Sequence, residues 1–109
     1  MRKLFEKIKI KTIEFESSIN EVSVYCEIST RENKFNTELI VSFSDLNRLL
    51  GRIQNATNEL NYEDVSSLFE KQVLENGEEY YSFSTKNSAY ENLEIDYFEF
   101  EDNTLEIRA

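Results

Sequence analysis

The sequence contains no histidine and no proline, and it has only one cysteine and two glycines among its 109 residues. Because histidine is the commonest general base and metal ligand, its absence excludes Ser-His-Asp and Cys-His nucleophilic systems. A zinc site built from cysteine and histidine is excluded by the same count. Gly51 and Gly77 cannot form a glycine-rich phosphate loop or a dinucleotide-binding motif. The sequence therefore indicates no enzyme, and we expect neither a cofactor nor a bound metal.

The single cysteine, Cys26, excludes an intramolecular disulfide and is typical of a reducing compartment. No apolar run approaches the roughly 18 residues that cross a bilayer. The first eleven residues are basic and lack the continuous apolar core of a signal peptide. These features predict a cytoplasmic protein with no membrane segment, and the length suits one domain spanning residues 1–109.

Charge is the strongest global feature, because 22 acidic residues face 12 basic ones and the formal net charge is −10. This balance argues against nucleic-acid binding, which needs a basic footprint on the protein. It favours attraction of a basic protein partner, although an acidic surface also serves simply to keep a small domain soluble. The charge is uneven, since residues 1–12 carry five basic side chains and one acidic side chain.

Alternation of apolar and polar residues predicts three strands, over residues 8–16, 22–29 and 35–43. A slip of one residue would expose a whole apolar set, so the pattern also predicts the register. The expected partners are Ile28–Phe35, Cys26–Thr37, Val24–Leu39, Val22–Val41, Phe15–Val22 and Ile13–Val24.

The first strand changes phase between Ile10 and Ile13, which predicts a β-bulge near Lys11-Thr12. The alternative is that the residues before Ile10 form a separate helical turn. Cys26 falls on the inward face of the second strand, where we expect it to pack as a small hydrophobic residue.

A helix is predicted over residues 44–55, where Leu46, Leu49, Leu50 and Ile53 recur at helical spacing. Ser44 is the expected N-cap. Arg48 and Arg52 would lie one turn apart on its exposed side and form ion pairs. A second helix is predicted to start at Asn61 or Asp64 and to stop at Asn76-Gly77, with an apolar stripe of Val65, Leu68, Phe69 and Val73.

Three further strands are predicted over residues 79–85, 93–101 and 104–109, with the last two joined by a turn at Asp102-Asn103. That hairpin would set Glu99 opposite Glu106, so we expect the basic first strand to lie beside the last strand and offset the repulsion. The predicted fold is α+β: a six-stranded antiparallel sheet of two three-stranded meanders, in the order 3-2-1-6-5-4, with a central pair of helices packed on one face. Strands three and four would be the edges, guarded by charged residues but by no proline, so an edge-strand dimer stays open and the oligomeric state is unknown.

Tyrosine is enriched at protein interfaces because it buries a large area and keeps a polar tip. The candidate partner surface comprises Tyr25, Glu27, Glu38, Ile40, Tyr80, Tyr97, Glu99 and Glu106. It predicts a non-enzymatic protein-binding or regulatory module, comparable by analogy to small acidic inhibitors and immunity proteins. The plainer interpretation is that tyrosine favours strands. The alternative function is a small-molecule-binding domain, with an apolar pocket between sheet and helices lined by residues such as Phe43, Phe69, Phe83 and Tyr81.

Overall fold

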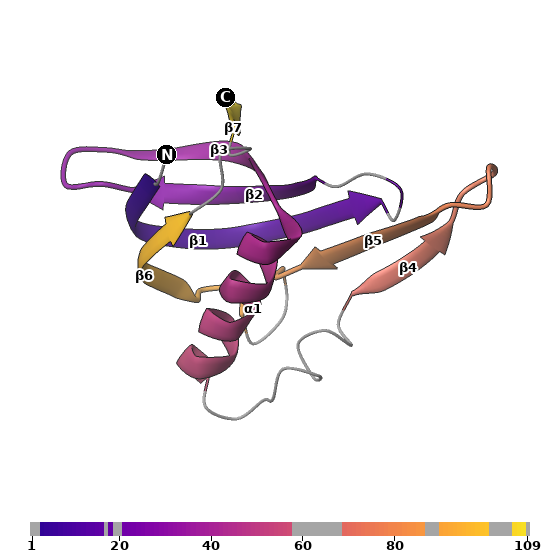
Figure 1. Ribbon diagram of the computed structural model, residues 1–109. Coiled ribbons are helices and arrows are strands. Elements are labelled where there is room, and N and C mark those ends of the chain that lie inside the picture. The colour runs from indigo at the N-terminus through magenta and orange to yellow at the C-terminus, as the bar shows by residue number, and fades with distance from the viewer. Residues whose placement is uncertain are drawn as a thin grey trace.

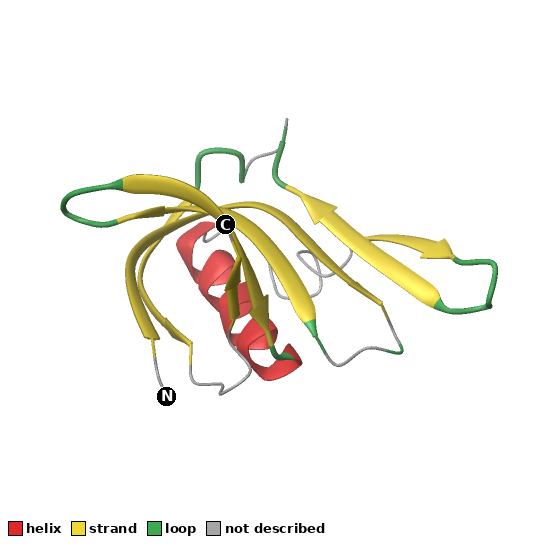
Figure 2. Cartoon of the chain, turned by 90° about the horizontal axis from the view of Figure 1, so that it is seen from above, coloured by secondary structure: helices red, strands yellow, loops and turns green. Residues whose placement is uncertain are grey.

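A computed structural model describes residues 3–16, 18, 21–57, 69–86, 90–100 and 106–108, with residues 3, 54–57 and 106–108 described by their backbone alone. One antiparallel sheet dominates the fold, and a single described helix lies across one of its faces (Figures 1 and 2). The elements in chain order are β1 (Lys3–Glu16), β2 (Val22–Ser29), β3 (Lys34–Val41), α1 (Phe43–Thr57), β4 (Glu70–Val73), β5 (Glu79–Ser84), β6 (Glu94–Phe100) and β7 (Glu106–Arg108). The predicted class, α+β with an antiparallel sheet, is confirmed.

The first three strands form the predicted meander. Every pair predicted between β2 and β3 is observed, and so is every pair predicted between β1 and β2. The register of β1 shifts between Ile10 and Thr12, which confirms the β-bulge and lets Ile8 and Ile10 point to the same face as Ile13. Because β1 already begins at Lys3, the alternative of a separate helical turn before Ile10 is wrong.

The other edge of β1 carries two strands, so the predicted order 3-2-1-6-5-4 is wrong. β6 pairs with β1 along Lys3–Lys9, and β5 pairs with it along Thr12–Glu16. The main path through the sheet is β4-β5-β1-β2-β3-β7. The physical reason is length: β1 has 14 residues, whereas β5 has 6 and β6 has 7, so one edge of β1 accommodates both.

The last strand, β7, pairs with β3 and not with β1 or β6, with Leu39 opposite Ile107. The predicted pairing of Glu99 with Glu106 is therefore wrong, and the turn residues Asp102-Asn103 lie outside the described residues. The charge argument did identify an acidic neighbour for β1, but the wrong one. That neighbour is β6, where Lys7 Nζ lies 3.7 Å from Glu94 Oε2.

The predicted second helix is wrong over its last part, because residues 70–73 form strand β4, paired with β5. Residues 61–68, where it would begin, lie outside the described residues. Asn76-Gly77 forms a hairpin turn, in which the Gly77 N–H donates to Leu74 O at 2.9 Å and Gly77 adopts a φ of 86°. Alternation around an Asn-Gly pair is a hairpin signal, and here it outweighs the helical spacing of Phe69 and Val73. Val73 is accordingly 63% exposed.

Helix α1 covers the apolar face of the sheet with the predicted stripe, since Leu46, Leu49, Leu50 and Ile53 are all buried. It starts earlier than predicted, and its N-cap is Ser42 and not Ser44. The Ser42 hydroxyl accepts a hydrogen bond from the Asp45 N–H at 3.1 Å, and Ser44 is exposed. The core between helix and sheet is built chiefly from inward residues of β1, β2, β3 and β6.

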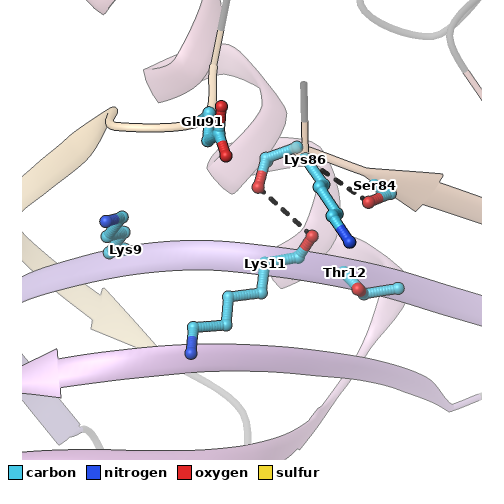
Figure 3. A pocket seen from close by; sticks show the side chains of 7 residues that line it. Lys9, Lys11, Thr12, Ser84, Lys86 and Glu91 are labelled. Carbon is cyan, nitrogen blue, oxygen red and sulfur yellow. Dashed lines mark hydrogen bonds between the residues drawn. The ribbon is translucent and has the colours of Figure 1, made fainter. Parts of the chain in front are cut away.

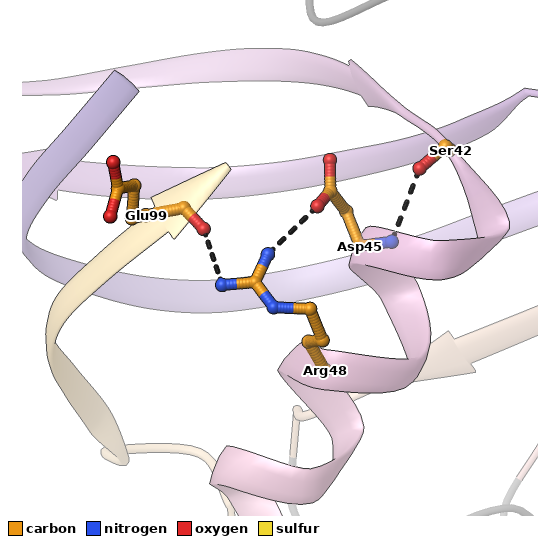
Figure 4. A network of polar contacts seen from close by, with 4 residues as sticks. All are labelled: Ser42, Asp45, Arg48 and Glu99. Carbon is orange, nitrogen blue, oxygen red and sulfur yellow. Dashed lines mark hydrogen bonds and ion pairs between the residues drawn. The ribbon is translucent and has the colours of Figure 1, made fainter. Parts of the chain in front are cut away.

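Two arginines fasten α1 to β6, so Arg48 and Arg52 are not a free basic spot. Arg48 pairs with Asp45 at 2.9 Å and donates to the Glu99 carbonyl at 2.7 Å (Figure 4). It also lies over the Phe98 ring, 4.9 Å from the ring centroid. Arg52 donates to the carbonyls of Asp96 and Tyr97. These bonds hold β6 at Tyr97, whose φ of 53° is the only positive value among the described non-glycine residues.

Candidate functional site

The face of the sheet opposite α1, here called the helix-free face, carries half of the predicted partner surface. Tyr25 on β2 lies opposite Glu38 on β3 and opposite Thr12 on β1. Glu27 lies two residues further along β2, opposite Lys9. Tyr80 of β5 reaches the same face from the other side of β1, so the structure brings Tyr25, Glu27, Glu38 and Tyr80 to one surface.

The other four predicted residues do not extend this exposed surface. Ile40 alternates with the inward residues Leu39 and Val41 and so lies on the outward side of β3, as expected, but it is only 3% exposed. The side chain of Glu106 lies outside the described residues. Tyr97 and Glu99 are on β6, where their carbonyls accept hydrogen bonds from the arginines of α1.

Strands three and four of the prediction, β3 and β5, are not the free edges that were expected. β7 covers the outer edge of β3 from Glu38 to Ile40, and β4 covers the outer edge of β5. The residues of β4 were predicted to belong to a helix, and β7 was predicted to lie beside the first strand. Among the described residues, β7 leaves the outer edge of β3 uncovered over residues 34–37, and an edge-strand dimer stays a prediction.

An acidic recess of about 170 Å³ opens beside Tyr80 on the helix-free face. Its polar lining consists of Tyr80, Ser23, Glu14, Glu16 and Glu21. Partial burial, a hydrogen bond to Glu14 and the negative charges of Glu14 and Glu16 together raise the pKa of Tyr80 to about 12. Burial is the largest cause of the raised pKa, the acidic neighbours add to it, and the phenol remains neutral as a hydrogen-bond donor.

Glu14, Glu16 and Glu21 were absent from the predicted surface, although the signal for two of them was present. The predicted register sets Ile13 and Phe15 inward, so Glu14 and Glu16 must point to the same side as Tyr25. Their proximity to Tyr80 depends on the pairing of β5 with β1, which aligns Glu16 with Tyr80. That pairing was not predicted.

A second, apolar recess of about 260 Å³ lies between α1 and the sheet. Phe43, Phe69 and Tyr81 line it, as the alternative function predicted, together with Phe15, Leu46, Asn47 and Leu50. Phe83 is not part of its lining but contacts Phe69, with ring centroids 5.4 Å apart and the rings tilted by 32°. Phe15 is the centre of this cluster and stacks on Tyr81 at 4.9 Å.

Cys26 and the carboxylate side chains were the other candidates for a reactive or metal-binding site. Cys26 is buried, and this burial raises the pKa of its thiol to about 12, which keeps it protonated and unreactive. Among the described residues no group of three or more Cys, Asp or Glu side chains is arranged to hold a metal ion. Helix α1, the helix that the structure describes, is too short and too polar to cross a membrane.

Comparison of the chain with protein-family models, with curated proteins and with solved structures finds no match.

Proposed function

We propose that the protein is a non-enzymatic binding module whose helix-free face receives a basic protein partner. The observation that carries this proposal is the acidic recess, whose lining contains three glutamates beside Tyr80, of which Glu14 shares a hydrogen bond with the Tyr80 hydroxyl. A recess of this size admits the end of one arginine or lysine side chain. Binding energy at interfaces is concentrated where such an anchor side chain enters a pocket.

The carboxylates of the recess suit this role because none of them forms an ion pair with a described basic residue. Within the described part of the chain, no basic group lies within 4.0 Å of Glu14, Glu16 or Glu21. A guanidinium entering the recess would thus meet carboxylates that have no basic partner among the described residues. Tyr25, which is 39% exposed, lies next to the recess and supplies an amphipathic aromatic surface for the rest of the contact.

The test is a native pull-down at low salt that compares three forms of the immobilised protein. The double variant Glu14→Gln/Glu16→Gln removes two charges from the recess. The control Glu32→Gln/Glu75→Gln removes two exposed charges from hairpin turns elsewhere. We expect the wild type and the control to retain the same basic protein, and the recess variant to lose it. Equal loss of the captured protein in both double variants would show that binding depends on net charge and not on the recess. Capture of no protein at low salt would contradict the proposal.

The apolar recess supports a second candidate function, the binding of a small apolar molecule. Its volume of about 260 Å³ is slightly below the range of about 300–1,000 Å³ that is usual for ligand pockets, and three of its lining side chains are phenylalanines. The test is an NMR titration with benzene, followed at Leu50 and Tyr81. Asn47→Trp, at the exposed rim, would obstruct the recess and should abolish the shifts. Shifts that persist in that variant would place the ligand elsewhere.

A further inference from the structure

A third recess, of about 330 Å³, lies where β5 and β6 part on the shared edge of β1. The gap lies at the bulge at Lys11, and Thr85, which also lines the recess, donates from its hydroxyl to the Ile10 carbonyl at 2.8 Å. Three lysines line the recess: Lys9, Lys11 and Lys86. They come from both sides of the gap, since Lys86 follows β5 and the other two are on β1 (Figure 3).

These lysines have neutral partners where the structure gives them any. Lys11 Nζ donates to Asn36 Oδ1 at 2.8 Å, and Lys9 Nζ lies 3.5 Å from Asn92 Oδ1. No carboxylate of a described residue is within 4.0 Å of the ammonium groups of Lys9, Lys11 or Lys86. In a chain with a net charge of −10, a recess lined by three lysines that form no ion pair with a described residue is unusual, although the ammonium group of Lys11 is directed away from Lys86 toward Asn36 on β3 (Figure 3).

Two hydroxyl groups complete the lining, on Thr12 and Ser84, which are opposite each other in the pairing of β1 with β5. The Lys86 N–H donates to Ser84 Oγ at 3.3 Å, which leaves the hydroxyl proton of Ser84 available for another acceptor. In Figure 3 the Lys86 side chain extends from the end of β5 toward Thr12. The recess is therefore rich in donors, and the one carboxylate in its lining is Glu91.

We propose that this recess binds the phosphate group of a small phosphorylated molecule. A phosphate dianion accepts several hydrogen bonds at once, and lysine is a common phosphate ligand acting as a point charge. Lys9, Lys86 and the hydroxyls of Thr12 and Ser84 would contact the phosphate oxygens. Lys11, whose ammonium group is bonded to Asn36, would attract the phosphate from a longer distance. The volume exceeds that of phosphate alone and leaves room for a short organic group.

The acidity of the rest of the chain disfavours a nucleic acid as the source of the phosphate. The site shares no residue with the acidic recess, so it does not rest on the proposed protein-binding function.

The experiment is an NMR titration of the full chain at low ionic strength, with methyl phosphate and inorganic phosphate as separate probes and acetate as the carboxylate control. We expect both phosphates to shift the amide signals of Lys9, Thr12, Ser84 and Lys86 in the wild type. Lys9→Gln and Lys86→Gln should each weaken methyl phosphate binding by about tenfold, the loss of one charge-assisted contact. Glu91→Gln should strengthen it by about threefold, because a like charge at the recess is removed.

Lys34→Gln is the matched control, since it removes one exposed positive charge from β3, away from the recess. It should change methyl phosphate binding less than about twofold. Circular dichroism of each variant shows whether the fold is intact. The proposal is overturned if phosphate causes no shifts at the recess, if Lys34→Gln weakens binding as much as Lys86→Gln, or if acetate binds as tightly as methyl phosphate. Binding of inorganic phosphate but not of methyl phosphate would overturn the assignment to a phosphorylated molecule and leave a free-phosphate site.

Discussion

Replacing Arg48 with methionine should show that this side chain contributes more than Arg52 to the attachment of α1 to β6. Methionine keeps most of the aliphatic stem but removes three contacts: with Asp45 at 2.9 Å, with the Glu99 carbonyl at 2.7 Å and with the Phe98 ring at 4.9 Å. Loss of one partner of a fully buried ion pair costs about 3–5 kcal/mol. Here the Asp45 side chain is 2% exposed but that of Arg48 is 37% exposed, so water replaces part of the contact. We expect the free energy of unfolding to fall by about 2–3 kcal/mol, or about 8–12 °C in melting temperature.

The assay is urea unfolding of a double-mutant cycle made of Arg48→Met, Asp45→Asn and the double variant. If the two side chains interact as the structure shows, the double variant is less destabilised than the sum of the singles by about 1 kcal/mol or more. Arg52→Met is the control, because Arg52 contacts only backbone carbonyls of β6 in the described structure and should cost no more than about 1 kcal/mol. Additive effects of the two mutations, or an Arg48→Met cost no larger than that of Arg52→Met, would refute the reasoning.

Three further predictions concern single residues. Gly77→Ala should lower the free energy of unfolding by about 1 kcal/mol, measured by urea unfolding, because Gly77 has a φ of 86° that alanine adopts poorly; an unchanged stability would show that the turn relaxes. Cys26 should resist a thiol reagent in the native protein and react at the normal rate in denaturant, because burial raises its pKa from 9.0 to about 12. Stability should fall as the pH rises from 10.0 toward 12, because unfolded Tyr80 loses its proton near 10.0 and the folded form near 12. Tyr80→Phe should make that fall less steep in urea unfolding across this range, and an identical slope would contradict the assignment.

The parts of the fold that could be predicted are those in which neighbouring residues along the chain decide the structure. In the meander of β1, β2 and β3, each strand has one apolar face, and any slip would expose it, so Val24 must meet both Ile13 and Leu39. The bulge follows by the same logic, since only one extra residue reconciles the two halves of β1. The stripe of α1 likewise depends only on local spacing.

The parts that could not be predicted depend on a choice between edges that are equally suitable. Several acidic strands follow α1 in the sequence, and any of them could pair with the basic first half of β1. The composition of these strands does not decide which one does. The observed choice is β6, because only there does the aromatic pair Phe98 and Phe100 reach Phe5 and the core. The Asn76-Gly77 pair was compatible with a helix end and with a hairpin, and pairing with β5 decided between them.

Both candidate sites on the helix-free face follow from the same unpredicted fact, that one edge of β1 holds two strands. Alignment of β5 with the second half of β1 brings Tyr80 beside Glu14 and Glu16 and so creates the acidic recess. The point where β5 ends and β6 has not yet begun leaves the lysine recess over the bulge. Opposite charges are thereby separated along a single strand, with Thr12 at the boundary.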